Sequence, residues 1–309
     1  MDRLEAMSIL LAAAETGSLS AAGRRLGKPL TTISRKVVEL ETHLNVRLLN
    51  RSGRRLSLTD AGRSYAQASK RILEDVREAE RSASGEYSEP KGDLVITTSL
   101  ILGRQHVLPI VAEFLKANPG INVELLLANR VVNMMEEQVD LAIRIGNSPD
   151  SSLIAIHLGS TRRVVCGSPA YFSTHGIPRT PADLAKHDCV TIGGFMSPGT
   201  WTFKSGKSEI KVPVRSRLVV STAEAALDAA IAGVGIVSAL SFQLPAAIAA
   251  GQLKIVLRDF EPEPMSVDML YVGGRLMPRK LRAFCDFAAP RLRATLSRPI
   301  DIRQKNHPK

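Results

Sequence analysis

A cluster of hydroxyl and cationic side chains near residue 30 has the chemistry needed to read nucleic acid. Within six residues the sequence places Thr31, Thr32, Ser34, Arg35 and Lys36. Arginine and lysine donate hydrogen bonds to guanine edges or to phosphates, and hydroxyl groups contact either kind of partner. An ordinary solvated helix face has the same composition, so this stretch alone leaves both interpretations open.

A second group of cations lies some twenty residues further on. Residues 47–51 and 54–58 flank a Ser-Gly turn, a pattern that predicts a two-stranded wing. Arg51, Arg54 and Arg55 would lie at or beside the tip of this wing. Arginines in that position neutralise phosphates or enter a minor groove, which favours the nucleic-acid interpretation of the first cluster.

Three short helices would have to position these side chains. Apolar residues recur at helical spacing from Leu4 until Gly17, and Ser18 is placed to cap a second helix over Leu19–Leu26. Pro29 suits the turn or the first position of a third helix. The apolar stripe of this third helix comprises Ile33, Val37, Leu40 and Leu44. This order predicts a winged helix-turn-helix whose third helix carries the first cluster.

The net charge of +11 is unevenly distributed along the chain. Residues 1–60 carry +4 and residues 275–309 carry +8, whereas the middle of the chain is close to neutral. An excess of positive charge indicates an anionic partner. Residues 298–309 read as a basic disordered tail, so only the N-terminal excess coincides with a motif.

The N-terminal motifs resemble the signature of LysR-type transcriptional regulators. The resemblance implies that Ser34 and Arg35 enter the major groove with Thr31 and Thr32 beside them. It also implies that the wing arginines contact the backbone or minor groove; the predicted DNA-binding set includes Ser20, Lys28 and Lys36 as well. Many members carry Ser-Gln where this chain has Pro29-Leu30, so a polar contact common in the family is missing and we expect a different operator half-site. Leu30 would contact a thymine methyl instead, or would only pack. The residues that carry the resemblance are Ala21-Ala22, Leu26, Ile33-Ser34-Arg35, Leu40-Glu41, Leu48-Leu49-Asn50-Arg51 and Leu58-Thr59-Asp60-Ala61-Gly62.

A long helix is predicted after the wing, with Thr59 as its N-cap. Its apolar stripe could pack on the protein's own core, but near-balanced charge and the following Pro90-Lys91-Gly92 break favour a coiled coil with a second copy. A homodimer would present two recognition helices to a pseudo-palindromic site in double-stranded DNA. Family members often form tetramers. The stripe comprises Ala61, Tyr65, Ala68, Ile72, Val76 and Ala79.

Beyond residue 92 the pattern alternates between strands and helices, which predicts parallel α/β sheets in two lobes. A late strand over Met265–Val272 would return to the first lobe and leave a cleft between the lobes. This arrangement looks like the periplasmic-binding-protein fold used by LysR-type effector domains. The predicted divisions are residues 1–58 (winged helix-turn-helix), 59–89 (linker helix), 90–162 (first lobe), 163–264 (second lobe), 265–297 (return to the first lobe) and 298–309 (tail).

Ligands of such sheets bind beyond the carboxyl ends of strands. Thr98 and Ser99 precede a predicted helix, so their hydroxyls and the free N–H groups would hold a carboxylate, a frequent effector in the family; alternatively they only cap that helix. Arg144 would face the cleft or form a surface ion pair. The predicted effector-binding residues are Thr98, Ser99, Leu100, Asn129, Ile145, Gly146, Phe195, Met196, Ser221 and Thr222.

Other classes of protein receive little support. No apolar run spans a bilayer and no signal peptide is visible, so we expect a cytoplasmic protein without membrane contact. A solute-binding protein of the same two-lobed fold would need a secretion signal and has no use for residues 1–60. RNA polymerase would be a further partner if the regulator is an activator.

Catalytic, cofactor and metal sites are not predicted either. Gly233-x-Gly235 lacks the third glycine of a dinucleotide fingerprint, and Ser168 is not in a nucleophile elbow. His187 and Cys189 have no adjoining metal ligands, and three widely spaced cysteines favour buried free thiols. A DNA-binding enzyme would need a catalytic cluster, so we expect no enzyme activity, no cofactor and no metal.

Overall fold

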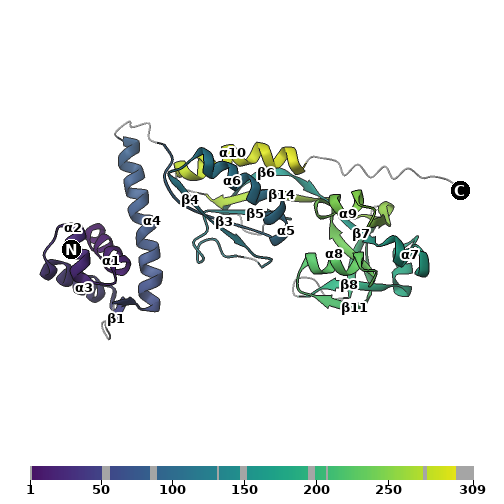
Figure 1. The fold of residues 1–309 in the computed structure, drawn as a ribbon, viewed down its shortest axis with the longest axis horizontal. Helices are drawn as coiled ribbons and strands as arrows, with labels where there is room; N and C mark the ends of the chain where they lie inside the picture. The colour runs from purple at the N-terminus through teal and green to yellow at the C-terminus, as the bar shows by residue number, and fades with distance from the viewer. Residues whose placement is uncertain are drawn as a thin grey trace. The chain divides into compact units, whose positions relative to one another are not determined.

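The computed structural model describes residues 2–50, 56–83, 89–130, 132–146, 152–193, 199–206, 208–273 and 277–296. The chain forms two compact units, Met1–Gly92 and Asp93–Lys309 (Figure 1). Among the described residues, no helix combines the length and apolar character needed to cross a bilayer.

Three helices build the core of the N-terminal unit, as the sequence predicts. They are α1 (Arg3–Thr16), α2 (Leu19–Leu26) and α3 (Leu30–Leu44). The Ser18 side chain accepts a hydrogen bond from the amide of Ala21, and Gly27 ends α2 in the left-handed conformation that favours glycine. Ile33, Val37 and Leu40 of the predicted stripe are fully buried against α1 and α2, so the opposite face of α3 is left to solvent.

A short wing follows α3. Strand β1 (Leu49–Asn50) pairs antiparallel with β2 (Ser57–Leu58), and the Glu41 carboxylate accepts hydrogen bonds from the amides of Leu48 and Leu49 at 2.7 and 3.1 Å. This side chain of α3 therefore fixes the start of the wing. The predicted wing residues Arg51, Arg54 and Arg55 lie outside the described residues.

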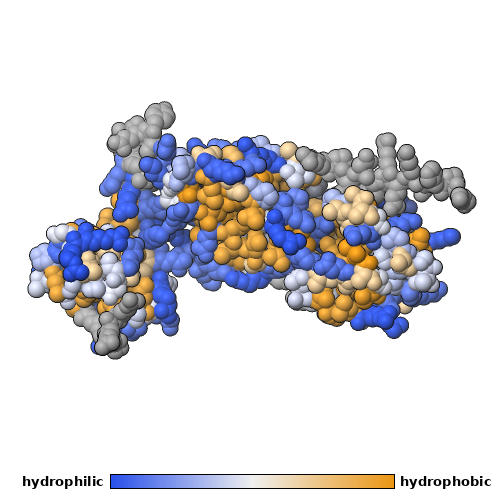
Figure 2. Space-filling view, viewed as in Figure 1, coloured by the Kyte–Doolittle hydropathy of each residue, from blue (hydrophilic) through white to orange (hydrophobic). Residues whose placement is uncertain are grey.

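Helix α4 (Asp60–Ala83) begins where the sequence predicts, because the Thr59 hydroxyl accepts a hydrogen bond from the Gly62 amide at 2.9 Å. A β-carbon at Gly62 would overlap the carbonyl oxygen of Leu48, which explains the glycine in the signature. Ala66 packs into the unit's own core, and Leu73 further along the helix is also buried. Figure 2 shows a mainly hydrophilic surface along α4.

The first lobe of the second unit is built on a five-stranded sheet of order β4-β3-β5-β14-β6. Strand β14 runs antiparallel between β5 and β6, which confirms the predicted return of the late strand. Helices α6 and α10 cover one face, where Phe114 and Phe284 meet edge to face at 5.1 Å between centroids. The bounds are β3 (Gly92–Thr98), β4 (Ile121–Leu127), β5 (Leu141–Ile145), β6 (Leu153–Thr161), β14 (Met265–Val272), α6 (Leu108–Ala117) and α10 (Arg279–Leu296).

The helical segment after β3 begins earlier than the apolar pattern indicates. It comprises α5 (Leu100–Leu102), a π-helical turn η1 (Gly103–Val107) and then α6. Gly103 lies in close contact with the side chains of Leu127 and Thr98, which leaves no room for a larger residue. Helical backbone therefore starts directly behind Ser99.

The second lobe has a sheet of order β11-β8-β12-β7-β13 and a separate hairpin of β9 and β10. The five-stranded sheets of both lobes are mixed, whereas the sequence predicts parallel sheets. In the second lobe, β7 pairs antiparallel with β12 and β13. The chain reaches β7 and β14 through crossings between the lobes, so no helical crossover fixes their direction. The bounds are β7 (Arg163–Gly167), β8 (Asp188–Ile192), β9 (Thr200–Ser205), β10 (Ser208–Pro213), β11 (Arg215–Val220), β12 (Ile236–Leu240), β13 (Lys254–Val256), α7 (Pro169–His175), α8 (Ala223–Ile231), α9 (Pro245–Ala249), and the 3-10 turns η2 (Pro181–Lys186), η3 (Ser241–Gln243) and η4 (Arg258–Phe260).

The three cysteines are buried free thiols, as the sequence predicts. Burial raises the pKa of Cys166 to about 12, and Cys189 and Cys285 show the same change. Uncharged thiols in apolar surroundings behave as small hydrophobic residues.

Candidate functional site

The solvent-facing side of α3 carries the first predicted cluster. Thr31 and Arg35 are exposed, while Thr32 and Ser34 are half-buried. The Arg35 side chain is 68% exposed, and its Nε lies 3.8 Å from the Glu39 carboxylate one turn away. That long, exposed contact holds the guanidinium weakly, so Arg35 is available to an external partner.

The two lysines of the predicted set have an internal partner. Lys28 Nζ and Lys36 Nζ lie 2.5 and 3.0 Å from the two carboxylate oxygens of Glu5 on α1. Their hydrogen bonds lower the pKa of Glu5 to about 2. The three side chains join α1 to the turn before α3 and to α3 itself, and they partly neutralise both lysines.

Two further positions complete the picture of this surface. Ser20 is exposed at the start of α2, and Leu30, where the chain departs from the usual family pattern, is 48% exposed at the start of α3. Pro29 occupies the N-cap and makes no side-chain hydrogen bond to the helix. Leu30, the second residue of the pair that replaces the usual Ser-Gln, therefore presents an exposed apolar side chain.

In the first lobe, the predicted effector residues gather at the carboxyl ends of β3, β4 and β5. Thr98 is fully buried, and within the described parts of the chain its Oγ1 has no hydrogen-bond partner. Ser99 occupies the N-cap without a capping hydrogen bond. The Leu100 amide is not free, because it donates to Asn129 Oδ1 at 3.1 Å; neither hydroxyl forms a hydrogen bond with another described residue.

Among the described residues, Arg144 does not form the surface ion pair that was one of its two predicted roles. Its guanidinium donates to the carbonyl of Ala128 at 3.2 Å and to Thr97 Oγ1 at 3.0 Å. Burial lowers the pKa of this arginine. It ties the ends of β3 and β4 together and so positions Asn129. Near it, Ile145 and Gly146 are half-buried at the end of β5.

In the second lobe, Thr222 caps α8, because its Oγ1 accepts from the Ala225 amide at 3.2 Å, while Ser221 is exposed. Sequence reasoning missed Glu224, whose two carboxylate oxygens are buried and have no hydrogen-bond partner among the described residues. A glutamate in the first turn of a helix is common and gives no functional signal in a sequence. The predicted residues Phe195 and Met196 lie outside the described residues.

A helix-turn-helix with an exposed polar recognition face, joined through a long helix to a two-lobed α/β unit, defines a ligand-responsive DNA-binding regulator. Two family models match the chain. The bacterial regulatory helix-turn-helix protein of the lysR family matches residues 4–63, and the LysR substrate binding domain matches residues 88–293. The chain belongs to the LysR family of transcriptional regulators.

Individual relatives agree with this assignment. An HTH-type transcriptional regulator of Xanthomonas campestris pv. campestris (strain 8004) is 34% identical over 288 residues, which cover 92% of this chain and 84% of the relative. The structure of CrgA, a LysR-type transcriptional regulator from Neisseria meningitidis, aligns with a TM-score of 0.61 at 30% identity. The alignment covers 93% of this chain and 98% of CrgA. The full-length structure of the Vibrio cholerae virulence activator AphB aligns with a TM-score of 0.58 at 27% sequence identity. This alignment covers 92% of this chain and 98% of AphB. The protein is a transcription regulator with an effector-binding domain, not an enzyme.

Proposed function

We propose that α3 reads an operator through Arg35, Ser34, Thr31 and Thr32, with Ser20 beside them. The observation that carries this proposal is the exposed, weakly held guanidinium of Arg35 on a helix face whose opposite side is buried. Arginine recognises guanine through two hydrogen bonds in the major groove. Leu30, which is 48% exposed, would contact a thymine methyl group.

The remaining cations would hold the backbone of the DNA. Arg51, Arg54 and Arg55 would contact phosphates or enter the minor groove beside the wing. Lys28 and Lys36 contribute less, because each shares its charge with Glu5.

Helix α4 would pair with a second copy of the chain. Part of the predicted stripe is left free by the unit's own core: Tyr65 packs against that core, but Ile72 is 41% exposed, and Ala68 and Val76 are half-buried. A homodimer would place two copies of α3 on a pseudo-palindromic operator, and dimers would pair to tetramers. Because the operator lies in the bacterial cytoplasm, we place the protein there, with RNA polymerase as a partner if the regulator is an activator.

An effector would bind between the lobes with a carboxylate near Thr98 and Ser99. The unpartnered hydroxyl of Thr98 and the uncommitted Ser99 support this end of the site. Glu224, with two buried oxygens that lack a donor, supports a hydrogen-bond donor at the other end of the ligand. Asn129, Ile145 and Gly146 would line the first lobe. The second lobe would contribute Ser221, Thr222, Phe195 and Met196.

Footprinting with the full-length protein on the DNA upstream of its own gene tests the dimer and the operator together. We expect two protected half-sites about 10 base pairs or a multiple apart. Ile72→Glu, which puts a charge into the seam, should weaken protection, while Gln67→Glu makes the same change of charge at an exposed position outside the stripe and should not. Equal footprints of both variants would contradict the seam.

A further inference from the structure

One short helical turn of the second lobe lies directly against the first lobe. This turn, η3, follows β12, and its Phe242 packs against the apolar cores of both lobes. In return, Ile101 of α5 in the first lobe is buried in the core of the second lobe. The two lobes are therefore held together by apolar side chains and not only by the chain crossings that join them.

Ser241 fixes η3 to the first of these crossings. Its Oγ lies 3.1 Å from Thr161 Oγ1 and accepts a hydrogen bond from the Arg162 amide at 3.1 Å. The Ser241 amide donates to the Arg162 carbonyl at 2.8 Å. These contacts set the place of Phe242 relative to the end of β6. A change in the contact between Phe242 and the first lobe therefore acts beside the point where the chain passes from one lobe to the other.

His106, in the π-helical turn η1 of the first lobe, is the titratable group that meets Phe242. The two rings lie edge to face with their centroids 5.6 Å apart, and the Phe242 backbone accepts a hydrogen bond from the imidazole. The other ring nitrogen, Nε2, is buried and has no hydrogen-bond partner in the described parts of the chain. A neutral imidazole tolerates this, because only one of its nitrogens carries a proton. An imidazolium carries two N–H groups, and burying one of them without an acceptor is costly.

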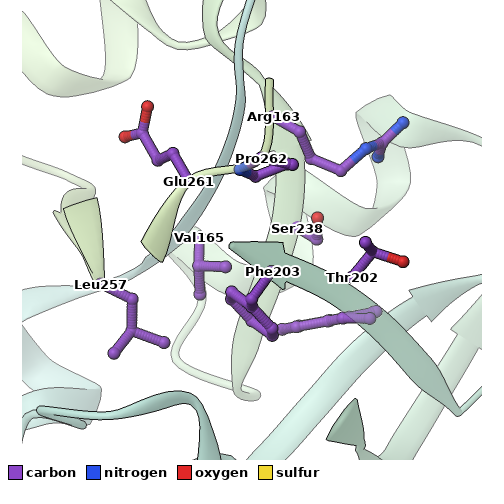
Figure 3. Close-up of a pocket in the computed structure, with 9 residues that line it drawn as sticks. Arg163, Val165, Thr202, Phe203, Ser238, Leu257, Glu261 and Pro262 are labelled. Carbon is purple, nitrogen blue, oxygen red and sulfur yellow. The ribbon is translucent and has the colours of Figure 1, made fainter. Parts of the chain in front are cut away.

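The charged side chains on the elements around His106 are exposed or bound to other groups. Glu261, at the second crossing, lies 2.7 Å from the guanidinium of Arg162, and Figure 3 shows it directed away from Arg163. The carboxylates of α6 and α10 are exposed. A proton on His106 would therefore find no free carboxylate among the described neighbours. The charged set comprises Arg104 on η1, Glu113 and Lys116 on α6, Arg279, Lys280, Arg282, Asp286, Arg291 and Arg293 on α10, and Arg162, Arg163 and Glu261 at the crossings.

We propose that His106 and Phe242 form a latch between the two lobes, which opens when His106 takes up a proton. The imidazolium gains acceptors from water once η1 and η3 separate, so protonation favours the open arrangement. Burial lowers the pKa of His106 from its ordinary value of 6.5, and the Phe242 backbone opposes this with a smaller effect. The latch therefore stabilises the closed arrangement fully above pH 6.5, and this stabilisation is lost as the pH falls through the lower folded pKa. Moderate acid thus acts on the arrangement of the lobes without a ligand.

Hydrogen exchange of the full-length protein, measured by mass spectrometry, tests the latch. Peptides over residues 100–107 and 240–244 report its two sides. Exchange at pH 7.5 and at pH 5 is compared after correction for the intrinsic pH dependence of amide exchange. We expect the protection of both segments to fall several-fold together at pH 5, because local opening exposes both. Peptides over α1, α2 and α3 should keep their protection.

Substitution of His106 shows whether the proton acts at this residue. His106→Phe keeps an aromatic ring against Phe242 but cannot be protonated, so both segments should stay protected at pH 5. His106→Gln also removes the titration in a smaller side chain, and it should give equal protection at the two pH values if the larger ring disturbs the packing. His157→Gln, at a histidine of the same lobe whose side chain is 66% exposed, is the matched control and should keep the full acid response.

The same data separate the latch from a second buried histidine. Burial also lowers the pKa of His187, which contacts Tyr171 within the second lobe. An acid effect at His187 appears in peptides over residues 169–192 and leaves residues 100–107 protected. Equal protection at both pH values in the unchanged protein, a loss confined to residues 169–192, or an undiminished acid response in both His106 variants would overturn the proposal.

Discussion

The exposed face of α3 and the second lobe hold the same kind of side chain in opposite surroundings. Arg35 is 68% exposed and weakly held by Glu39, whereas Arg163 is largely buried and has no described carboxylate beside it. An exposed guanidinium costs little to keep in water and suits DNA, whose phosphates and base edges come to the protein surface. A buried one is costly unless an acceptor reaches it. The contrast shows that the surroundings, not the residue type, decide whether an arginine is available to an external partner.

Removal of the exposed arginine should give the largest effect on function. Arg35→Ala should lower the preference for operator over scrambled DNA by about tenfold or more, because one bidentate base contact contributes about 1–3 kcal/mol of discrimination. Fluorescence anisotropy at one fixed salt concentration measures both affinities. Arg215→Ala, an arginine of the second lobe, serves as the control and should leave the preference unchanged. If Arg35→Ala keeps the full preference, α3 does not read the operator through this residue.

Thr222 and Ser99 each carry a hydroxyl at the start of a helix in the second unit. Replacing them separates a hydroxyl that stabilises the fold from one that we propose to bind the effector. Thr222→Ala should lower the free energy of unfolding by about 1 kcal/mol, since it removes a helix cap. Ser99→Ala should change it much less, because Ser99 makes no capping hydrogen bond. Urea unfolding of the two variants compares them directly. A larger loss for Ser99→Ala would assign Ser99 a structural role and remove it from the effector site.

The N-terminal unit should respond to acid through Glu5. The folded pKa of Glu5, about 2, lies below its ordinary value of 4.5. Its ion pairs therefore stabilise the fold fully above pH 4.5, and this stabilisation is lost as the pH falls through 2. Glu5→Gln should be less stable than the unchanged protein at pH 7, and the difference should shrink between pH 4.5 and 2. Thermal unfolding across this pH range checks it; a constant difference would argue against the ion pairs.

The smallest effect is expected from the internally paired lysine. Lys36→Gln should reduce the dependence of DNA affinity on salt concentration by less than one unit of the logarithmic slope, because Glu5 already partly neutralises Lys36. A salt titration of non-specific DNA binding measures this slope. A decrease of a full unit or more would show that Lys36 contacts a phosphate in the complex and exchanges Glu5 for it.

Sequence reasoning succeeded where the signals are local. The three N-terminal helices, the wing strands and the Thr59 cap follow from apolar spacing, capping residues and glycines within a few positions of one another. The Glu5 pairing with Lys28 was not predicted, because it joins residues 23 positions apart that only the packed helices bring together. The DNA-binding set could be proposed from the sequence because most of its members are near neighbours in the chain, and it stays a prediction.

The second unit was less predictable for the same physical reason. Strand β6 and the hairpin of β9 and β10 were missed, and the sheets are mixed because crossings between lobes set strand direction. Arg162 and Arg163 cannot be told apart in the sequence; only the folded register directs Arg162 to Glu261 and Arg163 to the Met265 sulfur. The Arg144 contacts with Thr97 and Ala128 likewise depend on three strands meeting at one edge.

The most direct test of the central claim is equilibrium binding of the full-length protein to DNA from upstream of its own gene, against scrambled DNA of equal length, across a salt series. We predict much tighter binding to the native fragment at every salt concentration, and a fall of both affinities with salt that reflects the phosphate contacts. Equal binding to the two fragments throughout the series would contradict sequence-specific reading by α3 and reduce the N-terminal unit to a positively charged surface.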